Sequence, residues 1–158
     1  MKPLLLAAGL LAAAALSGRS FPEGGPPPGA NAATDYDPDR TTHGFRLTPQ
    51  GGAIEIAVND GEDTESRDAI RAYLERMSKA FADGDFGAPL LIHGEKPPGV
   101  AVMTCEKAKI AWEYVETVRG GRVVATTDDA AARDVIHDFL RFEVEACRAE
   151  ELADDSDE

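Results

Sequence analysis

The segment HGFRLTPQGGAIEIAV, residues 43–58, has the pattern of a β-hairpin. Apolar residues alternate with small or polar residues on both sides of Gly51 and Gly52, which is typical of two antiparallel strands with one buried face. The inward positions are Phe45, Leu47, Ile54, Ile56 and Val58. The pattern therefore predicts a half-buried strand pair closed by a Pro-Gln-Gly-Gly turn.

The same pattern of strand, turn, strand and helix occurs a second time in the chain. Residues 43–82 align with residues 109–147, and both copies carry Thr before the turn, Gly-Gly at the turn and Arg-Asp in the helix. A ββα unit cannot bury its apolar face alone, so the two copies are expected to share one core. The sequence thus predicts an α+β two-layer sandwich, with a four-stranded antiparallel sheet and two helices on one face.

Each expected helix has an apolar stripe and a polar start. The stripe residues are Ile70, Tyr73, Leu74, Met77 and Phe81 in the first copy, and Ala132, Val135, Ile136, Phe139, Leu140 and Val144 in the second. The predicted N-caps are Asp63 or Thr64, and Asp128 or Asp129, because a side-chain oxygen there can accept from the free amides of the first turn.

The regions outside the repeat differ sharply in composition. Residues 1–18 resemble a signal peptide, because their apolar run is shorter than the roughly 20 residues of a membrane span. Residues 19–40 are rich in Pro and Gly and are predicted to be a disordered linker, as is the acidic tail at 150–158. A single domain over 41–149 remains, in a periplasmic or secreted protein without a membrane span.

The net charge of −13 limits the classes of partner. Such a charge repels phosphate backbones and anionic lipid, so neither nucleic acid nor a membrane surface is an expected partner. Basic proteins and cations would be attracted instead. Between the repeats, residues 83–107 hold apolar runs too long for an idle loop, and we expect them to pack over the sheet edge or its open face.

The sequence contains no recognised catalytic signature, and nothing in it favours an enzyme. The one set of residues with a chemical rationale is His43, His93, Met103 and His137, because imidazole with thioether suits copper and imidazole with carboxylate suits zinc. The alternative is that each of these side chains has only a structural role. A disulfide between Cys105 and Cys147 is disfavoured, because the second helix should separate them by roughly 25 Å at 1.5 Å per residue.

Four short segments carry a resemblance to known sequences: TTHGF at 41–45, TPQGGAIE at 48–55, PPGV at 97–100 and HDFLRF at 137–142. The chain resembles a group of uncharacterised exported bacterial proteins. The resemblance implies a small α+β domain behind a signal peptide or lipoprotein signal, with histidines recurring at the positions of His43, His93 and His137. It implies no activity. Arg19 stands where a lipoprotein would carry its lipidated cysteine.

Three hypotheses about function follow. The leading one is a non-catalytic exported domain that binds a protein partner or itself, through the open sheet face or the segment between the repeats. The alternative is a periplasmic accessory protein that binds copper or zinc through His43, His93 and His137. A weaker alternative is a small hydrolase or isomerase, which would need a closed pocket lined by His93 and a nearby carboxylate.

Overall fold

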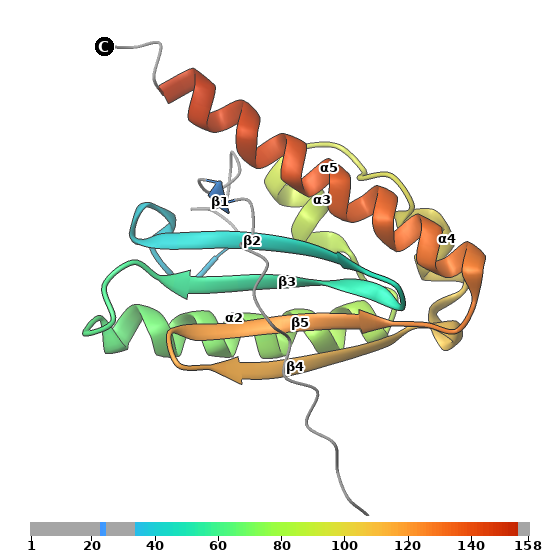
Figure 1. The fold of residues 1–158 in the computed structure, drawn as a ribbon, viewed down its shortest axis with the longest axis horizontal. Helices are drawn as coiled ribbons and strands as arrows, with labels where there is room; N and C mark the ends of the chain where they lie inside the picture. Colours follow the sequence, from blue (N-terminus) through green and yellow to red (C-terminus); the bar gives the residue numbers. More distant parts are fainter. Residues whose placement is uncertain (1–22, 25–33, 155–158) are drawn as a thin grey trace, which may run out of the picture.

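The computed structural model describes residues 23–24 and 34–154. Its strands are β1 (Glu23–Gly24), β2 (Thr41–Thr48), β3 (Gly51–Val58), β4 (Ala111–Thr117) and β5 (Gly120–Thr126). Its helices are α2 (Thr64–Ala82), α3 (Gly87–His93), α4 (Val100–Cys105) and α5 (Ala130–Asp154), with short 3-10 helices η1 (Pro38–Arg40) and η2 (Lys107–Lys109). Figure 1 shows these elements in chain order. Residues 1–18, the predicted signal peptide, lie outside the described residues.

The sheet has the strand order β1-β2-β3-β5-β4, and all neighbouring strands are antiparallel. The predicted four-stranded antiparallel sheet is confirmed, and the two-residue strand β1 extends it at the β2 edge. The two hairpins join through their second strands, where Ile54 pairs with Val123. The repeated units therefore meet at the centre of the sheet.

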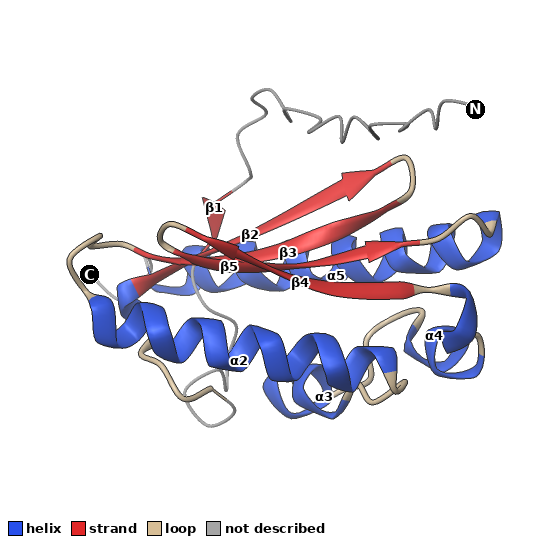
Figure 2. Ribbon diagram, turned by 90° about the horizontal axis from the view of Figure 1, so that it is seen from below, coloured by secondary structure: helices blue, strands red, loops and turns tan. Residues whose placement is uncertain are grey.

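The described helices lie on one face of the sheet, so the predicted two-layer architecture is also confirmed (Figure 2). Helix α2 packs mainly against β4 and β5, whereas α5 packs against β2 and β3. Each copy thus supplies the helix that covers the hairpin of the other copy. Because of this exchange, neither copy can bury its own strands without its twin.

The core follows the predicted stripes closely. Phe81 lies at its centre, with ring centroids 4.5 Å from Phe86 and 4.9 Å from Trp112. The prediction that Leu47 faces the core is wrong, because this side chain is 37% exposed. Leu47 lies next to the hairpin turn, and the side chain of Leu140 packs over its cross-strand partner Gly52 instead.

Both helix starts use the predicted caps. Asp63 accepts a hydrogen bond from the Ser66 amide at 3.1 Å, and Asp129 accepts one from the Ala132 amide at 2.9 Å. These bonds satisfy amides that have no partner within the helix. At both helices, the capping aspartate in the sequence therefore correctly predicts where the helix begins.

The domain is longer at both ends than predicted. Tyr36 and Pro38 are buried, so the end of the expected linker at 19–40 belongs to the fold. Helix α5 continues to Asp154, which corrects both the boundary at 149 and the expected disorder of the tail from 150. The last helical turns contain Ala, Leu and Glu, which have high helix propensity. Residues 155–158 lie outside the described residues.

The segment between the repeats lies on the helical side of the sheet, not over the sheet edge or the open face. It forms α3 and α4, and α4 packs against α5. Phe86 contacts the rings of both Phe81 of α2 and Phe139 of α5, so the start of the segment fills the space between the two long helices. Among the described residues, no helix is long and apolar enough to cross a membrane.

Gly52 is a point where the sheet tolerates no side chain. A Cβ atom there would lie 2.2 Å from Leu140 Cδ1 and 2.4 Å from the carbonyl oxygen of Arg46. We expect Gly52→Ala to lower the free energy of unfolding by about 1–3 kcal/mol, the usual cost of overpacking. Urea unfolding measures the difference. The control is Gly61→Ala, whose Cβ would meet nothing within 4 Å. Equal stability of the two variants would contradict the close approach.

Candidate functional site

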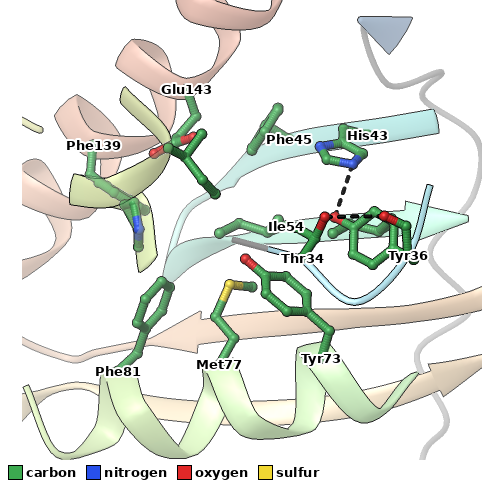
Figure 3. Close-up of a pocket in the computed structure, with 13 residues that line it drawn as sticks. Thr34, Tyr36, His43, Phe45, Ile54, Tyr73, Met77, Phe81, Phe139 and Glu143 are labelled. Atoms are coloured by element: carbon green, nitrogen blue, oxygen red, sulfur yellow. Dashed lines mark hydrogen bonds between the residues drawn. The ribbon is translucent and has the colours of Figure 1, made fainter. Parts of the chain in front are cut away.

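A small cavity lies between the sheet and the helices (Figure 3). It leaves about 40 Å³ for the centres of water-sized spheres. A single water-sized sphere itself occupies roughly 10–15 Å³, so the cavity has room for water or a small ligand. The lining residues are Thr34, Tyr36, His43, Phe45, Ile54, Ile56, Tyr73, Met77, Phe81, Pro89, Ile92, Phe139 and Glu143.

A buried contact between a histidine and a carboxylate borders the cavity. Nε2 of His93, at the end of α3, lies 3.0 Å from Oε2 of Glu143 on α5, and the two side chains are only 4% and 8% exposed. The contact ties α3 to α5. The second carboxylate oxygen of Glu143, Oε1, is buried and has no hydrogen-bond partner among the described residues. A buried oxygen in this state is costly and calls for an explanation.

A second buried polar contact closes the cavity on the β2 side. Tyr36 Oη lies 3.2 Å from Nε2 of His43. Burial lowers the pKa of His43 to about 4, so this imidazole is neutral at neutral pH. Burial likewise raises the pKa of the Tyr36 phenol far above its usual range. The contact therefore joins two neutral groups and holds the segment before β2 against the core.

Tyr73 links the two polar contacts. Its ring centroid is 5.4 Å from that of Tyr36, in an edge-to-face arrangement. Burial raises the pKa of the Tyr73 phenol to about 12, and the negative charge of Glu143 contributes to the shift. The cavity thus combines apolar walls with a few buried polar groups, one of which carries a negative charge when ionised.

His137 has a separate, structural partner. Its Nε2 lies 2.9 Å from the carbonyl oxygen of Thr48 and 2.8 Å from that of Gly51, so the ring N–H can donate to both. These carbonyls belong to the β2–β3 turn. Thr48 is five residues beyond His43 along β2, or roughly 17 Å at about 3.4 Å per residue. His137 therefore fastens the hairpin end to α5, at a distance from the cavity.

The structure does not bring the predicted metal ligands together. His43 lines the cavity, His93 contacts the lining residue Glu143, and His137 lies at the hairpin turn. Met103 is buried in the core, 1% exposed. Within residues 23–24 and 34–154, no three His, Cys, Asp or Glu side chains form a group that could hold a metal. The metal hypothesis gains no support from these positions, and neither Cys105 nor Cys147 is in a disulfide.

The geometry required for a hydrolase or isomerase is present only in part. Glu143 is the carboxylate near His93, and it lines the cavity. His93 lies behind Glu143 and is not a lining residue. The free space of about 40 Å³ is also far smaller than that of most enzyme pockets. Of the pair, Glu143 alone is among the described residues that line the cavity.

Glu143 and Tyr36 are the functional candidates that sequence reasoning missed. Glu143 follows Ile136 and Phe139 at helical spacing and precedes Cys147 by one turn, so it occupies a position on the apolar stripe. A charged residue at such a position is the signal that could have identified it. Tyr36 falls in the predicted linker because residues 19–40 contain three consecutive prolines at 26–28, several glycines and almost no large apolar side chains.

Comparison of the chain with protein-family models, curated proteins and solved structures gives no match. A proposal about its function therefore rests on the sequence and structure of the chain alone.

Proposed function

We propose that the chain is an exported, non-catalytic domain that binds a protein partner, or a second copy, through the outer surface of α3 and α4. The observation that supports this proposal is the exposure of three aliphatic side chains in the segment between the repeats. Leu90 is 45% exposed, Leu91 is 74% exposed and Val102 is 42% exposed. We call these three residues the inter-repeat surface.

The backbone under the inter-repeat surface is firmly held. Pro89 and Met103 are buried on the inner side of α3 and α4, and the His93–Glu143 contact fastens the end of α3 to α5. A single exposed leucine is ordinary on a protein surface. Adjacent leucines on a helix anchored by the buried His93–Glu143 contact are better suited to recognition, because little conformational entropy is lost when a rigid surface binds.

Charge favours a different protein over a second copy. Two copies of a chain with net charge −13 repel each other, whereas a basic partner is attracted. Charge of opposite sign also raises the rate of association. The partner that fits best is therefore a protein with positive charge around an apolar patch.

Leu91→Asp is the variant that tests this proposal. Leu91 is highly exposed, so the change should alter the free energy of unfolding by less than about 0.5 kcal/mol. We expect wild type to capture a partner by crosslinking in extracts of the exporting cells, and Leu91→Asp to lose that partner. Val118→Asp is the matched control, because Val118 is 88% exposed and lies in the β4–β5 turn, outside the inter-repeat surface.

Light scattering on the purified protein distinguishes the two kinds of partner. A dimer that Leu91→Asp dissociates would identify a second copy as the occupant. If wild type forms no complex in extracts and remains a monomer in solution, the proposal fails. Equal capture by Leu91→Asp and Val118→Asp would likewise move the binding site away from the inter-repeat surface.

A further inference from the structure

The buried carboxylate of Glu143 is only half satisfied by the protein. His93 contacts Oε2, whereas Oε1 is buried, has no hydrogen-bond partner among the described residues, and belongs to a side chain that lines the cavity. Burying a charged oxygen without a partner is unfavourable unless a bound group supplies one. This oxygen therefore defines the chemistry that a ligand of the cavity must have.

The walls of the cavity favour a cation. Five aromatic rings line it, from Tyr36, Phe45, Tyr73, Phe81 and Phe139. Among the described residues, the lining includes no lysine or arginine, and the pKa of His43 is lowered to about 4 by burial, so none of these lining residues carries a positive charge at neutral pH. An anionic ligand would lie beside the Glu143 carboxylate, with no positively charged side chain among the described lining residues to offset the repulsion. Aromatic faces around a carboxylate are instead suited to a positively charged group.

We propose that the cavity binds a small primary amine in its ammonium form. The ammonium group donates a hydrogen bond to Glu143 Oε1, and the aromatic rings surround the remaining atoms. A hydrogen bond between two charged groups is stronger than one between neutral groups, which distinguishes an amine from an alcohol of the same size. An apolar ligand would leave Oε1 without a partner.

The dimensions of the cavity restrict the amine. The cavity leaves only about 40 Å³ for the centres of water-sized spheres, which suits a small amine such as ethylammonium or the end of a longer amine. Of the lining residues, only Thr34 and Ile92 are partly exposed, and the others are buried. The amine therefore enters between the segment that precedes β2 and helix α3.

A methyl-detected NMR titration of the whole chain tests the proposal. Met77 lines the cavity, and Met103 is buried elsewhere in the core, so the two methyl groups serve as probe and internal reference. We expect ethylammonium to give a saturable shift of the Met77 signal and little change at Met103. Ethanol, a neutral molecule of similar size, should bind with an affinity at least about tenfold lower, because it lacks the charge.

Glu143→Gln removes the charge but keeps a side chain of the same shape, and it should weaken ethylammonium binding about tenfold or more. The matched control is Glu55→Gln, which removes a carboxylate from the open sheet face, where Glu55 lies 3.1 Å from Arg122. This variant should bind as wild type does. Leu91→Asp should also bind the amine, because the cavity does not involve the inter-repeat surface.

Two results would overturn the proposal. Equal binding of ethanol and ethylammonium to wild type would identify a cavity that selects only for size. The absence of any saturable Met77 shift would show that the cavity does not bind a small amine. Both comparisons use the wild-type chain, so they remain decisive even if Glu143→Gln fails to fold.

Discussion

Replacing His43 with glutamine should remove a large part of the acid sensitivity of this fold. Burial lowers the pKa of His43 from 6.5 to about 4, so the unfolded chain takes up a proton at this residue before the folded chain does. Between these two pH values, acid therefore stabilises the unfolded state. The resulting loss of stability is absent above pH 6.5 and reaches about 3 kcal/mol at pH 4, at 1.36 kcal/mol for each pH unit.

Urea unfolding of wild type and His43→Gln at pH 7 and pH 4 measures this effect. At pH 7 the variant should be less stable by about 1 kcal/mol, because glutamine replaces the partner of the Tyr36 hydroxyl imperfectly. At pH 4 the order should reverse. The carboxylates that also titrate in this range are the same in both proteins, so their contribution cancels in the comparison. A parallel loss of stability in both proteins would show that His43 is not buried as described.

The elements of this fold could be predicted from the sequence because their signals are local. Alternation around Gly51 and Gly120 identifies two hairpins, and helical spacing from Ile70 and from Ile136 identifies two helices. Asp63 and Asp129 cap those helices through amides three residues away. Each of these features depends on residues that are close together in the sequence. Each signal also occurs twice, once in each copy of the repeat.

The candidate site could not be predicted in the same way, because it depends on contacts between distant segments. Glu143 lies fifty residues from His93 in sequence, and nothing near either residue indicates the other. Tyr36 is buried only because His43 and Tyr73 provide a place for its ring. The spacing of apolar residues also cannot predict that each helix covers the hairpin of the other copy. A helix needs the same apolar stripe whichever hairpin it covers.

Removing His93 alone should destabilise the fold more than any other single change considered for this chain. His93→Leu leaves the buried Glu143 carboxylate without the partner that contacts Oε2 at 3.0 Å, in addition to its unpartnered Oε1. Removing the contact partner of a buried charged group costs about 3–5 kcal/mol, because the charge then stays in the core without compensation. We expect the free energy of unfolding at pH 7 to fall by about this amount, measured by urea unfolding.

The double variant His93→Leu/Glu143→Met separates the cost of the stranded charge from the contribution of the contact itself. With both polar side chains replaced by apolar ones of similar size, no polar atom of the pair stays buried, and such replacements are often neutral or stabilising. The double variant should therefore recover most of the stability that His93→Leu loses. It should also lose the amine response of Met77, since Oε1 is gone. If it is as unstable as the single variant, the pair matters for packing α3 against α5 and not for the charge it buries.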